Sequence, residues 1–492
     1  MHLVHYVRTH PRRAPAFLLL AGLILALGAA TQTPAATPQD QSAAPAALAK
    51  GVVIPEVPEN ADPSQTFALY LPADYTTKKQ WPVIYAFDWA ARGKVPAELY
   101  APAAQKRGYI VIASNNSRNG SAKESLDAAL ALWNDTRFRF SIDPQQVYAT
   151  GFSGASRSAF VFADQCMCVR GVIAVGAGLP PLKGQLLSLP FVVFMTLGYN
   201  DFNYPELVEL QQTLDSLHLP NRLRRFDGDH QWPPPEIAAE AVDWMQLEAI
   251  RQNRRPKDEA FIEDMRAAAL ARAKAAEKAG DLLSAYDEYR KSAADLDGLA
   301  DTAAFSARAA EMKASPDLQK AQKQEREDIA KQRRLMTDIE TQLTALPTGS
   351  MELGKRLSDI TSMANELNER ADRAKDPRDV RVFHRAIFDA FATAYEAGLG
   401  KARQGDTQMA EMYFQVAGSI APKLPGPPFE LAKLYARAGD KKRALRSLET
   451  AVAKGVKNPA SLRNPPEFES LRGEEKYQQL VAQLERGQQQ QQ

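Results

Sequence analysis

Short apolar runs alternate with amphipathic stretches between residues 53 and 253, a pattern that predicts strands alternating with helices. Most of the apolar runs are continuous, as expected for strands covered by helices on both faces. The predicted strands cover residues 66–71, 81–87, 109–114, 147–152, 172–176, 191–197 and 222–226. The predicted helices cover residues 96–106, 122–134, 155–165, 205–217 and 235–252. The alternation predicts an α/β fold with a doubly wound sheet, parallel after an early antiparallel pair.

Strand patterns end near residue 253, and the remainder predicts an all-α region with an internal repeat. The motif Gly405-Asp406 recurs 34 residues later as Gly439-Asp440, and a partial third copy contains Gly280. Small and large apolar residues follow the motifs at matching positions: Ala410, Phe414 and Ala417; Ala444, Leu448 and Ala451; Ala285 and Tyr289. This period and spacing are typical of tetratricopeptide repeats. The predicted repeats cover about 266–299, 391–424 and 425–458 of a helical region at 254–484.

A highly charged run at residues 319–344 interrupts the repeats, and it predicts a long solvated helix, with a coiled coil as the alternative.

Both ends of the chain differ in composition from the rest. Arg8, Arg12 and Arg13 precede an apolar segment ending at Ala30, which is the order of a secretory signal and is short for a membrane span. Residues 1–30 are therefore expected to direct export to a periplasm or the medium, with membrane attachment only if the signal is not cleaved. Residues 31–52 are expected to form a flexible spacer, and residues 485–492 a disordered Gln-rich tail.

A serine lies where a predicted strand meets a predicted helix. The strand at 147–152 ends in Gly151-Phe152, and Ser153-Gly154-Ala155 follows. Small residues beside a serine permit the sharp turn that presents a nucleophile at a strand–helix junction. The usual Gly-x-Ser-x-Gly pattern is altered at Ala155, which adds a methyl group where helix and strand approach closely. Ser153 is the candidate nucleophile, and a Gly/Ser-rich loop without chemistry is the alternative.

A carboxylate and a histidine follow the serine in the order Ser153, Asp201, His230. Asp201 comes just after the strand at 191–197, where ligand-handling residues of α/β sheets lie. His230 lies in a Gly-containing loop after the strand at 222–226. This order and placement predict a catalytic triad in which His230 is the general base and Asp201 orients it.

Other residues compete for two of these roles. Asp227 and Asp229 are alternative acids, but they are neighbours of His230 in sequence and point less naturally at its far ring nitrogen. His218 is the other histidine near the serine in sequence, and it ends a predicted helix, where a capping or surface position is expected.

Composition narrows the classes of function. The net charge is +2, from 61 basic and 59 acidic residues, and no basic-aromatic stripe predicts a nucleic-acid surface. No glycine loop for phosphate and no cluster with metal-ligand spacing is present, so neither a cofactor nor a metal is expected. Cys166 and Cys168 have no histidine nearby, which argues against zinc. A bridge across so short a loop would be strained, so a buried or labile pair is expected.

Three segments, at residues 70–75, 151–158 and 228–233, resemble the α/β-hydrolase superfamily, and the resemblance covers residues 53–253. The branch that they are most similar to is the carboxylesterases related to polyhydroxyalkanoate depolymerases and feruloyl esterases. The resemblance implies an oxyanion hole formed by the N–H of Gly154 and one from Asp88-Trp89, although the family's Gly-rich oxyanion loop is absent. Phe152 and Trp232 are candidates to line the substrate cleft, with a place in the core as the alternative.

These features predict an exported serine hydrolase that cleaves a small or polymeric ester through an acyl-enzyme, as carboxylesterases do. Residues 177–190 are too few for a lid domain, so an open cleft is expected. The helical repeats are expected to bind a protein partner, and residues 53–253 to fold and hydrolyse small esters without them. A catalytically inactive hydrolase-like scaffold is the alternative, and a peptidase with the same machinery stays open.

Overall fold

The computed structural model describes residues 48–180, 189–344 and 350–489. The described residues from Ala49 onward form one compact unit. The expected signal segment at 1–30, residues 31–47 of the expected spacer and residues 490–492 of the expected tail lie outside the described residues. Among the described helices, none is both long enough and apolar enough to cross a bilayer.

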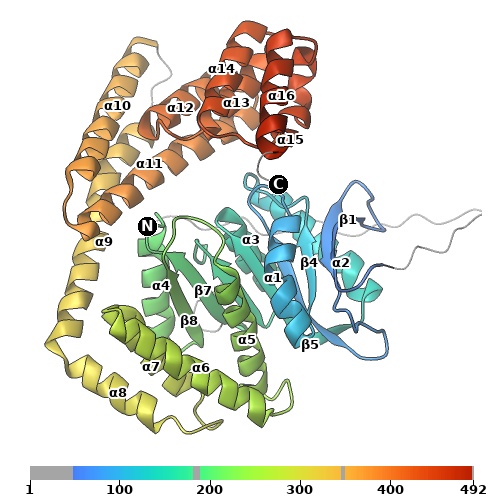
Figure 1. The fold of residues 1–492 in the computed structure, drawn as a ribbon, viewed down its shortest axis with the longest axis vertical. Helices are drawn as coiled ribbons and strands as arrows, with labels where there is room; N and C mark the ends of the chain where they lie inside the picture. The colour runs from blue at the N-terminus through green and yellow to red at the C-terminus, as the bar shows by residue number, and fades with distance from the viewer. Residues whose placement is uncertain (1–47, 181–188, 345–349, 490–492) are drawn as a thin grey trace, which may run out of the picture. The chain divides into compact units, whose positions relative to one another are not determined.

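Eight strands form one sheet in the order β1-β2-β4-β3-β5-β6-β7-β8 (Figure 1). Strand β2 pairs antiparallel with β1 and β4, and the other neighbours are parallel. The strands are β1 Val53–Pro58, β2 Thr66–Tyr70, β3 Trp81–Phe87, β4 Ile110–Ser114, β5 Ile142–Phe152, β6 Gly171–Val175, β7 Val192–Gly198 and β8 Asn221–Phe226. All seven predicted strands form. Strand β1 was missed because two prolines and an exposed Glu56 interrupt its apolar pattern, which suits its place at the sheet edge.

Helices cover both faces of this sheet (Figure 1). They are α1 Lys94–Arg107, α2 Ala122–Arg139, α3 Gly154–Cys166, α4 Tyr204–Ser216 and α5 Pro235–Arg251. Ile84 of β3 lies in a buried cluster with residues of α1 and α5. The next residue, Tyr85, packs against Trp133 of α2 and Phe162 of α3, because successive strand residues point to opposite faces. The α/β fold with a doubly wound sheet, predicted for this part of the chain, is confirmed.

The described residues after α5 contain only helices and their connections, which confirms the all-α part of the predicted fold class. The elements are α6 Glu259–Lys278, α7 Leu282–Asp295, α8 Ala303–Ala314, α9 Pro316–Thr344, α10 Ser350–Arg373, α11 Pro377–Arg403, α12 Thr407–Ile420, α13 Gly426–Arg437, α14 Lys441–Ala453, α15 Ala460–Arg463, the 3-10 helix η2 Pro466–Leu471 and α16 Glu475–Gln489.

The three Gly-Asp motifs of the repeat form turns of one kind. Gly280, Gly405 and Gly439 have φ angles of 75°, 78° and 76°, in the left-handed region that glycine adopts without strain. The aspartate after each glycine caps α7, α12 or α14, and its carboxylate accepts a hydrogen bond from a backbone N–H three residues later. The sequence repeat therefore corresponds to a repeated helix–turn–helix geometry, while its assignment to the tetratricopeptide family stays a prediction.

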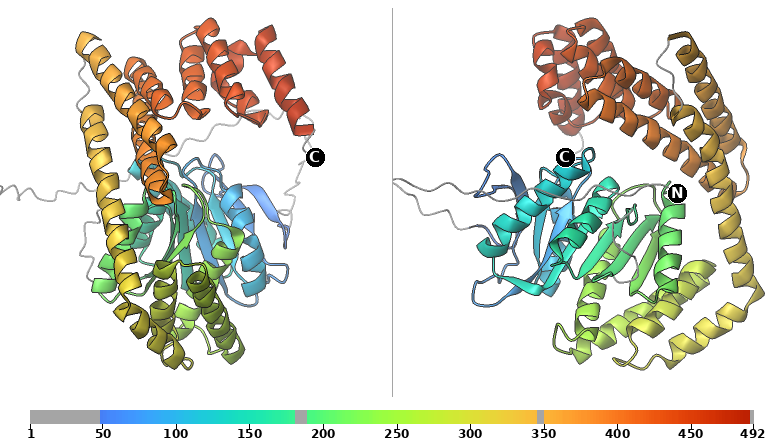
Figure 2. Two further views of the ribbon diagram at one scale, coloured as in Figure 1. Left: turned by 60° about the vertical axis from the view of Figure 1, so that its left-hand side comes forward. Right: turned by 180° about the vertical axis from the view of Figure 1, so that it is seen from behind.

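Strand β8 lies at the edge of the sheet, beside α7 (Figures 1 and 2), and its residues Arg222 and Arg225 are buried. Arg222 donates to Glu288 at 3.0 Å and to Asp295 at 2.6 Å, and Arg225 donates to Asp287 at 2.8 Å. Burial opposes ionisation of Asp287 and Glu288, but the neighbouring arginines outweigh it and lower the pKa of each to about 2. The sheet and the first helices after it thus share a buried ionic cluster.

The long charged helix differs from its expected solvated state. Helix α9 runs without a break through the charged segment and buries Ile329, Met336 and Leu343. It also reaches the sheet region, because the side-chain amide of Gln332 donates to the carbonyl oxygen of Phe202 at 2.8 Å. Ile329, Met336, Ile339 and Leu343 lie seven, three and four residues apart on one side of the helix, but the many charged residues between them favoured a solvated helix in the sequence.

Two smaller expectations are corrected. Cys166 and Cys168 are joined by a disulfide, with Cα atoms 5.1 Å apart, and neither residue is buried. Met167 between them has φ 53° at the end of α3, and this left-handed turn brings the two cysteines together. Helix α16 continues to Gln489, so residues 485–489, which we expected to be disordered, are helical.

Candidate active site

Ser153 occupies the junction between β5 and α3, as the sequence predicts. Its φ of 59° and ψ of −130° are an uncommon conformation for a residue with a side chain, and such strain is concentrated at functional turns. Its N–H donates to the carbonyl oxygen of Val175 on neighbouring β6 at 2.8 Å, which anchors the turn to the sheet. Ser153 is 9% exposed, at the carboxyl end of β5.

Backbone packing requires a glycine before this turn. A Cβ atom at Gly151 would lie 2.1 Å from the carbonyl oxygen of Ala155, so no larger residue fits there. A Cβ atom at Gly154 would lie 2.1 Å from Oδ1 of Asn119, so a larger residue there would displace that side chain. Ala155 is almost fully buried, and the fold accommodates the methyl group that departs from the usual pattern.

Asp201 and His230 form a hydrogen bond, with 2.9 Å between Oδ1 and Nδ1. Oδ1 of Asp201 also accepts the N–H of Asn203 at 2.8 Å, and the residue is 1% exposed. The imidazole packs between the rings of Phe152 and Phe202, with centroids 4.7 and 4.3 Å away. These contacts hold the ring of His230 in one orientation, with Nε2 on the side away from the acid.

The turn Val175-Gly176 brings the serine and the Asp–His pair together. The carbonyl of Val175 accepts the N–H of Ser153, as described above. A Cβ atom at Gly176, where φ is 64°, would lie 3.0 Å from Oδ2 of Asp201 and 3.1 Å from Nδ1 of His230. The three residues of the predicted triad therefore surround one turn at the carboxyl end of β6.

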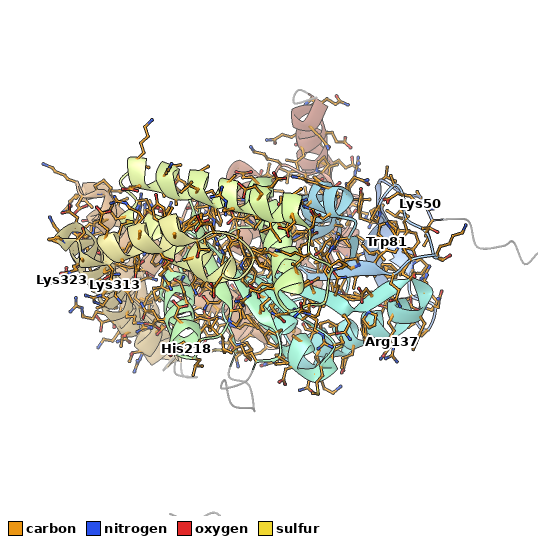
Figure 3. All side chains as sticks on the ribbon, turned by 90° about the horizontal axis from the view of Figure 1, so that it is seen from below. Lys50, Trp81, Arg137, His218, Lys313 and Lys323 are labelled. Carbon is orange, nitrogen blue, oxygen red and sulfur yellow. A yellow bond between two sulfur atoms is a disulfide. The ribbon has the colours of Figure 1, made fainter. Side chains whose placement is uncertain are left out.

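The competing residues lie elsewhere. Asp227 and Asp229 are exposed, and the carboxylate of Asp229 accepts a hydrogen bond from the side chain of Asn200 at 3.1 Å. His218 is exposed just after α4, where its N–H donates to the carbonyl of Asp215 (Figure 3). Of the three candidate acids, Asp201 is the one that contacts His230.

The predicted oxyanion residues supply two backbone donors. Gly154 is the first residue of α3, so its N–H has no acceptor within the helix. The N–H of Trp89 has no acceptor among the described residues. The carboxylate of Asp88 is fully buried and accepts from the N–H of Ala90 at 2.9 Å and from Trp232 at 3.0 Å. Asp88 therefore holds the loop in place with its side chain.

The two aromatic candidates for substrate contact pack mainly into the core. Phe152 belongs to the buried cluster between the sheet and helices α1 and α5, and Trp232 packs against that cluster. Their rings lie 5.6 Å apart, and Trp232 also contacts Tyr100. Phe152 thus supports the ring of His230 from beneath, and a contact of either aromatic with substrate stays a prediction.

Helix α11 approaches the nucleophile side of the site. The side-chain amide of Asn119, which touches Gly154, donates to Oε1 of Glu396 at 3.2 Å. Leu399 and Arg403 of the same helix line a cavity that Gly154 also lines. A helix of the all-α region therefore forms part of the wall beside Gly154, which the sequence did not indicate, and the open cleft stays a prediction.

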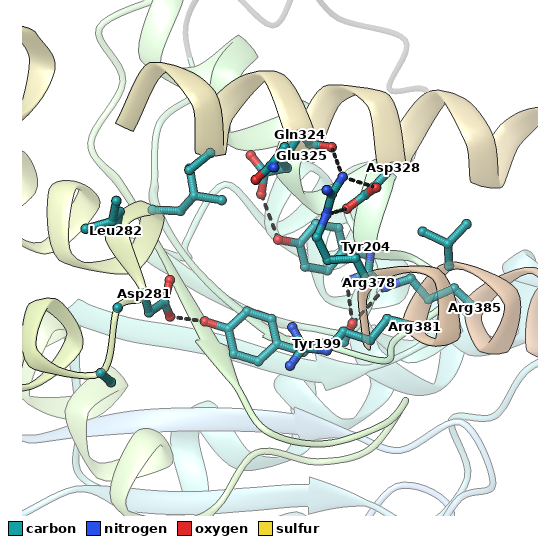
Figure 4. A pocket seen from close by; sticks show the side chains of 15 residues that line it. Tyr199, Tyr204, Asp281, Leu282, Gln324, Glu325, Asp328, Arg378, Arg381 and Arg385 are labelled. Carbon is teal, nitrogen blue, oxygen red and sulfur yellow. Dashed lines mark hydrogen bonds and ion pairs between the residues drawn. The ribbon is translucent and has the colours of Figure 1, made fainter. Parts of the chain in front are cut away.

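The same helix approaches the acid side (Figure 4). Nε of Arg385 donates to the carbonyl oxygen of Tyr199 at 2.7 Å, two residues before Asp201. Its guanidinium also stacks on the ring of Tyr204, with 3.6 Å between its carbon and the ring centroid. The sequence gave no local sign of these contacts. Asn119 and Glu396 are 277 residues apart in the chain, and Arg385 and Tyr199 are 186 residues apart.

In the described part of the chain, no group of three or more His, Cys, Asp or Glu side chains could hold a metal ion.

No protein-family model matches the sequence, and no curated protein is significantly similar to it. Several solved structures are similar to about two-fifths of the chain. The fluorophosphonate-binding serine hydrolase F of Staphylococcus aureus is 15% identical, with a TM-score of 0.33, over 40% of this chain and 99% of that one. An esterase of the archaeon Pyrobaculum calidifontis is 12% identical (TM-score 0.34, 41% and 87%). Esterase B of Lactobacillus rhamnosis is 15% identical (TM-score 0.33, 41% and 90%). At these identities the similarity concerns the fold alone.

Proposed function

We propose that this protein is a serine hydrolase that cleaves carboxylic esters through a covalent acyl-enzyme. The observation that carries the proposal is the hydrogen bond between Asp201 and His230, placed around the same turn as the strained Ser153. A buried carboxylate on Nδ1 fixes the imidazole with its other nitrogen available as a base, which is the arrangement that activates a serine.

The reaction proceeds in two halves. Oγ of Ser153 attacks the ester carbonyl while Nε2 of His230 takes its proton, and the N–H groups of Gly154 and Trp89 stabilise the oxyanion. The imidazolium, stabilised by Asp201, then gives its proton to the leaving alcohol, and the acyl group stays on Ser153. Water, deprotonated by His230, attacks the acyl-enzyme, and Ser153 leaves as the free hydroxyl with its proton restored.

A catalytically inactive scaffold is the second candidate. It is favoured by the low exposure of Ser153 and by the contact of Glu396 with Asn119, which together restrict approach to the nucleophile. In this case the helical repeats would carry the function by binding a protein partner.

A fluorophosphonate probe distinguishes the two candidates on the full chain. We expect covalent labelling of the wild type at Ser153, because the probe forms a tetrahedral adduct that the oxyanion donors stabilise. Ser153→Ala should lose the label, and Ser64→Ala, at an exposed loop serine, should keep it. A folded wild type that takes no label, or a label that persists in Ser153→Ala, would establish the scaffold instead.

Export to a periplasm or the medium is part of this proposal. The disulfide between Cys166 and Cys168 supports it, because disulfides persist in oxidising compartments. Fractionation of the producing cells and the intact mass of the mature chain test it. We expect the chain outside the cytoplasm and starting after Ala30, and retention of residues 1–30 in the cytoplasm would contradict export.

A further inference from the structure

A cavity of about 400 Å³ lies beside the residue that follows the nucleophile. Four parts of the chain form it: the segment from Arg118 into α2, helix α3, Pro180 after β6, and helix α11. Gly154 lines this cavity, so a group bound in it lies next to a predicted oxyanion donor. Its volume falls within the range of pockets that hold small molecules.

The charged side chains of this cavity are mostly arginines. Arg157 forms an ion pair with Glu206 at 2.6 Å, which neutralises it. Arg118 and Arg403 have no carboxylate partner among the described residues, and the guanidinium of Arg118 makes only a 3.5 Å hydrogen bond to the carbonyl of Asn116. Glu396 is the one acidic side chain in the lining, and it accepts the amide of Asn119.

Arg403 lies close to Gly120 at the cavity. A Cβ atom at Gly120 would lie 3.1 Å from the guanidinium carbon of Arg403, so the side chain lies directly against the backbone there. Gly120 has φ 146°, which disfavours any residue with a side chain at this contact. The arginine from α11 is therefore placed opposite the segment that carries Arg118.

The remainder of the lining is largely apolar. Leu126, Val161, Pro180 and Leu399 contribute to it, together with small residues. Two unpaired guanidinium groups beside an apolar wall suit a molecule with a hydrocarbon body and an anionic end, because arginine binds carboxylates through parallel hydrogen bonds.

We propose that the substrate is an ester that also carries a carboxylate, which Arg118 and Arg403 bind while the ester carbonyl reaches Ser153. This inference rests on the proposed hydrolase function. Both arginines are exposed to water, so their interaction with a carboxylate is partly screened. A preference of about 10-fold for the charged ester over a neutral analogue of the same shape is therefore expected.

Matched pairs of esters test the preference on the full chain. One pair carries the charge in the alcohol part, para-acetoxybenzoate against para-acetoxybenzamide, and the other in the acyl part, monomethyl adipate against methyl adipamate. We expect kcat/KM to favour the carboxylate in at least one pair by about 10-fold. The preference should fall close to parity in the double variant Arg118→Gln/Arg403→Gln and stay unchanged in Arg446→Gln, an exposed arginine of α14. No preference in either pair, or a preference that the double variant retains, would overturn the inference.

Binding distinguishes failure of the inference from failure of the proposed function. Benzoate and benzamide are titrated by calorimetry into the full Ser153→Ala chain with and without the two arginine substitutions. If the wild type hydrolyses no ester and takes no fluorophosphonate, the hydrolase proposal fails. Benzoate binding that weakens about 10-fold on loss of the arginines then still supports the anion site. Equal binding of benzoate and benzamide overturns that site.

Discussion

The guanidinium of Arg385 donates hydrogen bonds from Nε and Nη2 to the carbonyl oxygen of Tyr199, and the Nε bond measures 2.7 Å (Figure 4). Arg385 belongs to α11, whereas Tyr199 begins the turn that carries Asp201. The helical region thus holds the backbone of the loop that presents the predicted acid. Because a small displacement of a catalytic group costs much of its effect, this contact is expected to influence turnover.

Replacing Arg385 tests this link. Arg385→Ala removes the donors to Tyr199 and the stacking on Tyr204, so the loop with Asp201 is expected to loosen and kcat/KM to fall by roughly 10- to 100-fold. Ester hydrolysis by the full chain measures it. Arg334→Ala, at an exposed position of α9, is the control and should behave as the wild type. An Arg385→Ala chain with wild-type activity would show that the loop needs no support from α11.

The assignment of the acid is tested by exchanging carboxylates for amides. Asp201→Asn is expected to lower kcat by about 1,000- to 10,000-fold with the fold intact, because the amide favours the wrong imidazole tautomer. Asp229→Asn should change kcat little, since its carboxylate contacts Asn200 rather than His230. Rates on an activated ester and thermal unfolding are measured for both. The opposite ranking would transfer the role to Asp229.

Asp389 of α11 predicts a pH dependence of stability. Burial, followed by repulsion from Glu340, Glu206 and Asp201, raises the pKa of Asp389 from 3.8 to about 7. The raised pKa means that the folded state binds the proton of this carboxyl group more tightly than the unfolded state does. The group therefore stabilises the folded state most when it is protonated and least when it is ionised. Its contribution to stability is therefore lost as the pH rises from about 4 to about 7.

The variant Asp389→Asn keeps the neutral form at every pH. We expect it to raise the midpoint of thermal unfolding by ~2 °C or more near pH 8 and to leave it almost unchanged near pH 4. Asp372→Asn, at an exposed carboxylate of α10, should have no effect at either pH. A stabilisation of equal size at both pH values would show that the carboxyl does not titrate differently on folding.

Truncated chains test how much of the helical region the sheet needs for folding and activity. A chain of residues 53–253 loses the acidic partners of Arg222 and Arg225 and uncovers Leu247 and Ile250, which pack with residues of α6 and α7. Contrary to the expectation from sequence, this chain should unfold or aggregate. A chain of residues 49–424 keeps α11 and should retain folding and activity. Circular dichroism and ester hydrolysis measure both, and a folded, active 53–253 chain would restore the original expectation.

Local patterns determined much of this protein. Continuous apolar runs are enough to predict buried parallel strands, because strand burial depends on residues close together in the chain. Gly151 likewise indicated the turn around Ser153, since a Cβ atom there would meet the backbone of Ala155, four residues later. The chain order of Ser153, Asp201 and His230 was sufficient to single out residues that the fold places around one turn.

The tertiary structure alone decided what surrounds that turn. Helix α11 reaches Asn119 through Glu396 and the acid loop through Arg385, although 277 and 186 residues separate these partners. Individual arginines and glutamates of a charged helix carry no periodic signal that names a distant partner, so the sequence favoured solvated faces and indicated neither contact. Such contacts arise only when buried apolar faces bring the helices together, and the charged side chains then pair with the groups that they meet.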